Sequence, residues 1–476
     1  MQKKKKDRFK NYEEDVKHLV LDFESMEESG GSRYFDLDEM EIIIDFYLDN
    51  SDGDMIEKSV RYGEYLFPSS NEIRLRRAHL LCFKERYNDA YKMLKQLEQV
   101  QPDNTEVQYA LGAVLSALDQ PRKAIQYYQK ASADGHELGI IYGNIADEYV
   151  KMDRRAEARN YYRKALALKP DDEHSLYELA NCYEDDNLID KWIEYYQRFV
   201  GEHPYSKVAW FCLGEGYAAA SLFEKAIDAY QYAITIDPEF FYAYSQTSLC
   251  YLTLGDYSKA VEALHEAYEH TEDKAQVSFR IGDIYRMQNN QETAIYYFRR
   301  ALKEDPFYAE AWHAMSTCHT ATFSFESAID CAQRALNIEP DNPIYLTTLA
   351  LIYADSGDYE NADLVFEKTI PLFSDFEQGW IAFADYQIVR GNFEAAIEGL
   401  TKGLPTCELV MEFNKRLALC YYMTGRRNML FNAVRACIFD NPDGAKELLE
   451  YLPELEKDPE VMNIIASHIN HNDYSI

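Results

Sequence analysis

A chain of 476 residues would ordinarily divide into about three globular domains. Its formal net charge of −33 argues against non-specific binding to nucleic acids, because their phosphates would be repelled, and favours a solvated acidic surface. Nine cysteines without a C-x-x-C pair argue against a disulfide framework and favour a reducing compartment, so we expect a cytoplasmic protein. No apolar run approaches the ~18 residues of a membrane helix, so no membrane partner is expected.

Residues 1–36 predict a basic tail followed by one N-terminal capping helix. Lys3–Lys6 precede no apolar segment, which argues against a secretory signal and favours a disordered tail. Further on, apolar residues fall on one face of an amphipathic helix: Tyr12, Val16, Leu19, Val20, Phe23 and Met26. This helix either covers the open end of the structure that follows or folds into a groove of the same chain, and we favour the cap.

From residue 37 to residue 444 one pattern returns every 34 residues without an insertion. The clearest copy is Lys207–Pro238, and Lys207 is counted here as position 1. Position 20 is alanine in nine of the twelve copies, and position 8 is small in eleven. Position 11 is tyrosine in eight copies, and position 32 is proline in eight. Four coinciding columns over most of the chain indicate a repeat protein.

Each copy predicts two helices of about 13 residues. Positions 4, 7, 8 and 11 lie on one face of the first helix, and positions 20, 24 and 27 lie on one face of the second. Small residues at 8 and 20 let the helices approach closely, and larger residues at 4, 7, 11 and 24 fill the space around the crossing. Glycines at position 15 are expected to adopt a left-handed conformation at the end of the first helix. One hairpin cannot bury its apolar face alone, so the copies should stack.

Two departures from the regular pattern are informative. Trp192 and Phe199 replace alanine at positions 20 and 27 of the fifth copy, so we expect a local change in helix packing there. Beyond residue 444, Lys446–Leu452 and Pro459–Ile469 predict short helices with one apolar face each, so residues 445–476 are expected to form C-terminal capping helices.

Motifs for chemistry are missing from the sequence. It contains no G-x-S-x-G elbow, no P-loop and no H-E-x-x-H motif. The best metal candidate combines His313, Cys318, His319 and Cys331, but residues 313 and 319 lie about 240° apart around a helix and would not converge. His468 and His471 would supply only two ligands. We therefore expect no enzymatic activity, no cofactor and no metal.

The small, tyrosine and proline columns resemble the tetratricopeptide repeat (TPR), a 34-residue helix–turn–helix unit. The resemblance implies an all-α fold, a right-handed superhelix (α-solenoid) of about twelve stacked antiparallel helix pairs. First helices would line a concave groove, and family ligands contact mainly positions 2, 5, 9 and 12. Transferred to this chain, positions 5, 9 and 12 give a candidate peptide-binding groove: Tyr109, Asp147, Tyr177, Asn181, Phe211, Glu215, Phe279, Asp283, Arg286, His313 and Asp385.

This mixture of aromatic rings and carboxylates favours a protein or peptide partner with basic and apolar side chains. A clamp for a C-terminal carboxylate, as in chaperone-binding members, is not expected, because the bases are chiefly Arg286 and Lys415, four repeats apart. The leading hypothesis is a non-catalytic scaffold or adaptor. The alternatives are an energy-independent chaperone or assembly factor, the regulatory subunit of a separate enzyme, and, last, a nucleic-acid reader.

Overall fold

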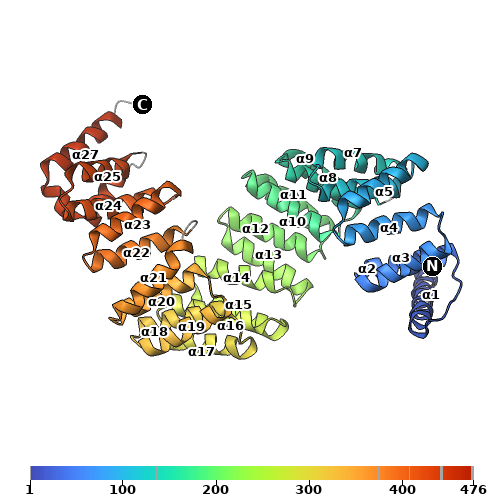
Figure 1. The fold of residues 1–476 in the computed structure, drawn as a ribbon, viewed down its shortest axis with the longest axis horizontal. Helices are drawn as coiled ribbons and strands as arrows, with labels where there is room; N and C mark the ends of the chain where they lie inside the picture. Colours follow the sequence, from blue (N-terminus) through green and yellow to red (C-terminus); the bar gives the residue numbers. More distant parts are fainter. Residues whose placement is uncertain (1, 136, 373–375, 407, 440–442, 473–476) are drawn as a thin grey trace. The chain divides into compact units, whose positions relative to one another are not determined.

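The computed structural model describes the backbone of residues 2–135, 137–372, 376–406, 408–439 and 443–472, and their side chains except those of 2–15, 134, 406 and 468–472. Two compact units divide the chain, unit 1 (Met1–Cys250) and unit 2 (Tyr251–Ile476). The elements found in these ranges are helices, coloured in chain order in Figure 1. The predicted all-α fold of stacked helix pairs is confirmed.

The helices of the first half are α1 (Gln2–Ser29), α2 (Leu37–Asp49), α3 (Gly53–Leu66), α4 (Asn71–Phe83), α5 (Tyr87–Val100), α6 (Thr105–Ala117), α7 (Pro121–Ala131), η1 (Ser132–Asp134), α8 (Leu138–Lys151), α9 (Arg155–Leu168), α10 (Glu173–Asp185), α11 (Ile189–Glu202), α12 (Lys207–Ala219), α13 (Phe223–Ile236) and α14 (Phe241–Thr253). Those of the second half are α15 (Tyr257–His270), α16 (Lys274–Met287), α17 (Gln291–Glu304), α18 (Ala309–Ala321), α19 (Phe325–Ile338), α20 (Pro343–Asp355), α21 (Tyr359–Thr369), η2 (Ile370–Leu372), α22 (Glu377–Val389), α23 (Phe393–Gly403), η3 (Leu404–Thr406), α24 (Val410–Met423), α25 (Arg427–Ile438), α26 (Gly444–Tyr451), η4 (Pro453–Lys457) and α27 (Pro459–Asn472).

The even-numbered helices from α2 to α24 are the predicted first helices. Nine of these twelve begin at the predicted position 1, and α8, α16 and α24 begin one residue earlier. The residue before several of them is a polar cap whose side chain accepts a hydrogen bond from a backbone amide in the first turn: Asp36, Ser70, Asn104, Ser206 and Asn342. Capping satisfies amides that have no partner within the helix, and so fixes where each repeat starts.

Every first helix is followed by a left-handed residue at position 15. Four are the predicted glycines: Gly255, Gly357, Gly391 and Gly425. The other eight repeats place an ordinary residue there: Ser51, Glu85, Asp119, Asp153, Asn187, Ser221, Asn289 and Phe323. The turn between the two helices therefore keeps one backbone geometry, whatever side chain it carries.

Helices cross closely where position 8 meets position 24 of the same repeat. A Cβ atom built on Gly214 would lie 2.4 Å from Cε1 of Tyr230, and one built on Gly282 would lie 2.7 Å from the ring of Phe298. In the first repeat the larger Ile44 faces the smaller Val60, and both are buried. Alanines of position 20, such as Ala226, are fully buried as predicted. The two positions thus compensate each other in volume.

The tyrosines at position 11 were expected to fill the space around the helix crossing, and they do so only in part. Tyr47 and Tyr183 are buried, but other tyrosines of this column are only half-buried. Several tie one repeat to the previous one, because a side chain at position 25 donates a hydrogen bond to the tyrosine hydroxyl. The pairs are Gln197 Nε2 to Tyr217 at 2.7 Å, Gln333 Nε2 to Tyr353 at 3.3 Å, and Arg163 to Tyr183. Position 11 therefore contributes to stacking between repeats as well as to packing within one.

The bulky Trp192 is accommodated by the following repeat. A Cβ atom on Gly216 of α12 would lie 3.3 Å from the indole ring, so a glycine provides the space that the tryptophan fills. Trp192 is 2% exposed, and no hydrogen-bond partner is found for its Nε1. In place of the usual small residue of the fifth repeat stands a large one, and the next repeat makes room for it with a glycine. This is the local change in helix packing at Trp192.

The two ends of the chain are covered by helices. On α1, Val20, Phe23 and Met26 are buried in the apolar cluster of the first repeat, which favours the cap over a groove latch. The expected disordered tail is corrected at the backbone level, because α1 already begins at Gln2; the side chains of Lys3–Lys6 and Tyr12 lie outside the described residues. Beyond α25, buried apolar residues of the terminal helices close unit 2: Leu448, Leu452, Leu455, Val461 and Ile465.

We predict that Gly214→Ala destabilises the fold, because the added methyl group meets the ring of the fully buried Tyr230. The expected loss is about 1–3 kcal/mol of unfolding free energy, measured as a lower urea midpoint. Gly201→Ala in the last turn of α11 is the matched control, since nothing lies within 4 Å of a Cβ there and an alanine should be neutral or stabilising. Equal midpoints for the two variants would contradict the predicted crossing.

Candidate interaction surface

The eleven predicted groove residues lie on first helices, six in unit 1 and five in unit 2. We call the side chains at positions 2, 5, 6 and 9 of these helices the first-helix surface. Many of the predicted residues have partners within the chain, so their capacity to contact a ligand differs from one to the next.

Two predicted carboxylates are anchored by tyrosines at position 24 of their own repeat. The hydroxyl of Tyr162 donates to Oδ1 of Asp147 at 2.5 Å, and the hydroxyl of Tyr230 donates to Oε1 of Glu215. Burial raises the pKa of Glu215 above its usual range, while the hydrogen bond from Tyr230 lowers it. Asp147 also accepts from His174 Nε2 at 3.0 Å. Both carboxylates therefore help to hold the helices together.

The predicted Asp385 forms a bidentate ion pair with Arg416 of the next repeat, with Nε–Oδ1 2.7 Å and Nη2–Oδ2 2.9 Å. Asp45 and Arg76 repeat this geometry in unit 1, at 3.1 and 2.8 Å. In both cases an aspartate at position 9 binds an arginine at position 6 of the following repeat. Such fork-shaped pairs are strong and directional, so they fix neighbouring repeats in register.

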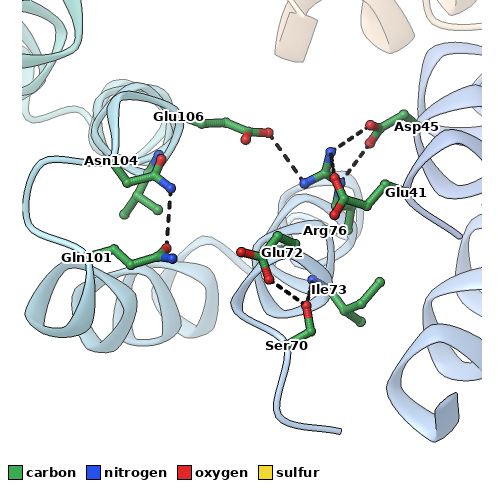
Figure 2. A network of polar contacts seen from close by, with 10 residues as sticks. Glu41, Asp45, Ser70, Glu72, Ile73, Arg76, Gln101, Asn104 and Glu106 are labelled. Carbon is green, nitrogen blue, oxygen red and sulfur yellow. Dashed lines mark hydrogen bonds and ion pairs between the residues drawn. The ribbon is translucent and has the colours of Figure 1, made fainter. Parts of the chain in front are cut away.

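Arg76 is the centre of an acidic cluster that joins three first helices (Figure 2). Its side chain is 8% exposed, and its Nη atoms lie 3.1 Å from Glu41 of α2 and 3.8 Å from Glu106 of α6. Burial raises the pKa of both glutamates, and the guanidinium opposes that rise. With Asp45, three carboxylates share one cation, which leaves two net negative charges on this part of the surface.

An aromatic ladder lies in repeats 5 to 7 of unit 1, formed by Tyr177, Phe211, Phe240 and Tyr242. Consecutive ring centroids are 6.0, 5.3 and 6.2 Å apart. The predicted Phe211 is 8% exposed and also packs 5.5 Å from Tyr230, so it supports its neighbours rather than offering a face of its own. Tyr177 is half-buried, and Tyr242 is 68% exposed. The ladder thus runs from the core to the surface.

A cleft of about 630 Å³ adjoins this ladder, and we call it the junction cleft. Lys207 connects the two, because its Nζ lines the cleft, lies 5.3 Å from the Phe240 ring centroid and pairs with Asp237 at 2.7 Å. Tyr205, which is 86% exposed, stands in the lining, and three further acids complete its charged part: Asp171, Glu173 and Glu202. The cleft therefore combines an exposed ring with an excess of carboxylates.

The other predicted residues of unit 1 are less closely grouped. Tyr109 packs 5.7 Å from Tyr128 and accepts a hydrogen bond from Asn144 Nδ2 at 3.0 Å. Asn181 is exposed, and its Nδ2 is 3.4 Å from Glu178 Oε1. Neither contributes to the ladder or to the junction cleft.

In unit 2 the predicted residues form separate small groups. Phe279 repeats the arrangement of Phe211, with its ring 5.6 Å from Phe298 and 5.0 Å from Tyr308. Arg286 Nε donates to Asp283 Oδ1 at 2.9 Å. His313 Nε2 lies 2.9 Å from Thr348 Oγ1, and its ring centroid is 4.8 Å from that of Tyr345. Burial, and then Arg286, lower the pKa of His313.

The residues that the sequence interpretation missed have a common source. Tyr242, His174 and Glu106 occupy position 2, which is one of the family's contact positions but was not followed along the chain. Arg76 and Arg416 occupy position 6, which gives no signal by itself, because an arginine there is also typical of a solvated helix face. Only the aspartate 31 residues earlier would have indicated the pair.

The structure gives no sign of a metal or redox centre in the part of the chain it describes. No group of three or more His, Cys, Asp or Glu side chains there could hold a metal ion. Four thiols at position 10 are free and buried: Cys182, Cys250, Cys318 and Cys420. Burial raises the pKa of Cys318 to about 11, which disfavours the reactive thiolate. The side chains of His468 and His471 lie outside the described residues.

Comparison with known proteins agrees with this architecture. The tetratricopeptide repeat profiles match residues 144–207 and 250–309, and residues 105–132 and 345–370. The chain is 21% identical over 270 residues to anaphase-promoting complex subunit CDC16 of Saccharomyces cerevisiae, which covers 55% of this chain but only 32% of the yeast protein. It is 20% identical over 399 residues to BBSome complex member BBS4 of Bos taurus, covering 81% of this chain and 73% of that protein.

Among solved structures, the APC/C hetero-tetramer Cut9–Hcn1 aligns with 93% of this chain and 94% of its own, at 13% identity and a TM-score of 0.37.

Stacked helix pairs joined by short turns define a helical-repeat protein. The column pattern and the matching profiles identify tetratricopeptide repeats in this chain. No described helix is long and apolar enough to span a bilayer.

We predict that Arg76→Met destabilises unit 1 by about 3–5 kcal/mol at pH 7, because it leaves the surrounding carboxylates without their cation. Arg74→Met is the control, since Arg74 makes only an exposed hydrogen bond to Gln96 and should cost little. Without Arg76, the raised pKa values of Glu41 and Glu106 should rise further. Protonation of these glutamates would then relieve the repulsion. The loss of unfolding free energy relative to the wild type, measured with urea, should therefore be smaller at pH 5 than at pH 7. Equal deficits for both variants would contradict this role.

The contact between His174 and Asp147 predicts a titration that NMR can follow. Partial burial lowers the pKa of His174, but the hydrogen bond and charge of Asp147 outweigh it, so the pKa lies above its usual 6.5. The contact therefore stabilises the fold below the unfolded-state pKa, and this contribution is lost as the pH rises through the folded-state pKa. Asp147→Asn should lower the pKa of His174 and leave that of His265 unchanged. An unchanged His174 pKa would show that the contact does not form in solution.

Proposed function

We propose that this protein is a non-catalytic scaffold or adaptor that holds a partner protein against its first-helix surface and the junction cleft beside it. The aromatic ladder and the junction cleft of unit 1 form the main contact. The partner segment carries basic and apolar side chains.

The exposed tyrosines beside the junction cleft are the observation that carries this proposal. Tyr205 and Tyr242 are 86% and 68% exposed, although each offers a large apolar ring. Tyrosine supplies much contact area with few rotatable bonds, and it is enriched among the residues that dominate binding energy. Exposed rings around a polar-rimmed cleft are typical of an interaction site.

The charges around the cleft support a basic partner. Four carboxylates and one ammonium group line it: Asp171, Glu173, Glu202, Asp237 and Lys207. The ammonium group is already engaged, 2.7 Å from Asp237 and 3.8 Å from Glu173. An arriving lysine or arginine would therefore meet an excess of acceptors, and this complementarity would favour both its approach and its register.

Perturbed titratable groups do not indicate chemistry in the described residues, because packing explains them. Burial raises the pKa of Glu215. Tyr230, its hydrogen-bond partner, also packs against Phe211, so this environment belongs to the helix crossing. Perturbed pKa values suggest a catalytic site when they converge in a cleft. Here burial raises the pKa of Tyr162 and Tyr230, which are position-24 residues of separate helix crossings.

A permanent place in a multiprotein complex is a second candidate. Its support is that CDC16 and BBS4 are both named as members of a complex. Such a role differs from that of a chaperone or assembly factor, which releases its client, and from that of a regulatory subunit, which would co-purify with an enzymatic activity. Co-elution of the protein with its partner through gel filtration at cellular concentration would favour the complex.

The test is affinity capture from a lysate, with mass spectrometry, using the wild-type chain and the double variant Tyr205→Ala/Tyr242→Ala. Both side chains are exposed, so the fold should be unchanged. We expect a captured partner to fall about tenfold in abundance, as loss of two hot-spot rings would produce. Tyr65→Ala/Tyr296→Ala is the matched control, because these rings are 77% and 62% exposed elsewhere on the chain. Equal capture by the two double variants would contradict the proposed surface.

A further inference from the structure

One junction in unit 2 has a histidine in place of the tyrosine that accepts a hydrogen bond at three other junctions. At three junctions a position-25 side chain donates to the position-11 tyrosine of the next repeat, as Gln197 does to Tyr217 at 2.7 Å. Between the eighth and ninth repeats, position 25 is Arg299 and position 11 is His319. No hydrogen bond or ion pair is found for Arg299 among the described residues.

A cleft of about 540 Å³ occupies this junction, and we call it the His319 cleft. Leu302 of α17 and Met315 and Trp312 of α18 supply its apolar lining. On the side of α19, the guanidinium of Arg334 lies 4.7 Å from the Trp312 ring centroid and pairs with Asp330 at 3.0 Å. The cleft thus has a rigid aromatic wall beside a polar rim.

The rim of the His319 cleft is unusually basic for this chain. Three cations and two carboxylates contribute to the lining, which gives a local excess of positive charge in a protein of net charge −33: Arg299, Lys303, Arg334, Glu326 and Asp330. Arg334 is already paired, whereas Arg299 and Lys303 are exposed and have no ion-pair partner among the described residues. Burial, and then Arg299, lower the pKa of His319, so its imidazole is neutral at pH 7.

We propose that the His319 cleft receives an acidic, aliphatic segment of a partner protein. A carboxylate of the segment binds Arg299 and Lys303, and an adjacent apolar side chain packs against Leu302, Met315 and Trp312. A single carboxylate matches the two unpaired cations, whereas a phosphate dianion would also face the carboxylates of the same rim. The His319 cleft has the opposite charge preference to the first-helix surface. This proposal does not depend on the function proposed for the first-helix surface.

The probe is a fluorescein-labelled peptide of alternating Glu and Leu, followed by fluorescence anisotropy with the full chain at physiological salt. Screening at this ionic strength limits long-range repulsion by the acidic chain. Arg299→Glu/Lys303→Glu should weaken binding by about tenfold or more, as removal of both cations requires. Lys191→Glu/Arg198→Glu on α11 makes the same charge change at exposed positions outside the cleft, and it should leave the affinity within about twofold.

A second variant tests the cleft by shape rather than charge. His319→Tyr restores the tyrosine column, should fill the cleft and gives Arg299 a hydroxyl partner, so peptide binding should be lost while the melting temperature stays the same or rises. The proposal is overturned if the Glu/Leu peptide does not bind, or if it binds the two cleft variants as tightly as the wild-type chain. It is also overturned if a Lys/Leu peptide binds and loses affinity in the same variants, since the cleft would then select cations.

Discussion

In several repeats, the first helix presents a glycine at position 8 to a large ring at position 24 of the second helix, at a distance that leaves no room for a second side chain. Gly214 faces Tyr230 and Gly282 faces Phe298 in this way, whereas the first repeat combines the larger Ile44 with the smaller Val60. In these repeats a change of volume at one position is matched at the other, as close packing requires. Trp192 and Gly216 extend the same compensation across a junction between repeats. Ion pairs between surface residues of neighbouring repeats, such as Asp45 and Arg76, add to this packing.

The period and the helix starts could be predicted because they follow from this packing. Small residues at positions 8 and 20 mark the crossing, and their spacing places the first helices to within one residue. The partners of the surface residues could not be predicted in the same way. Glu215 is free on a helical projection, but the long side chain of Tyr230 reaches it from the second helix of the same repeat. Arg76 meets Asp45 only once neighbouring repeats are stacked, so single-helix periodicity cannot show the pair.

Two surfaces of opposite charge preference result from these contacts. Around Arg76, and at the junction cleft, carboxylates outnumber cations, and aromatic rings lie beside them in repeats 5 to 7. At the His319 cleft, Arg299 and Lys303 have no ion-pair partner among the described residues. The binding chemistry proposed for each surface thus comes from a few residues of an otherwise regular array.

The turn at position 15 keeps the same left-handed backbone whichever side chain it carries. Eight repeats hold this conformation with a residue other than glycine, and Phe323 does so with its ring exposed to water. Such a backbone costs about 1 kcal/mol for an ordinary residue. Each of these turns is therefore a place where stability was given up locally without loss of the array. Glycine substitutions there would let an engineer adjust the rigidity of single hairpins one by one, while both binding surfaces keep their composition.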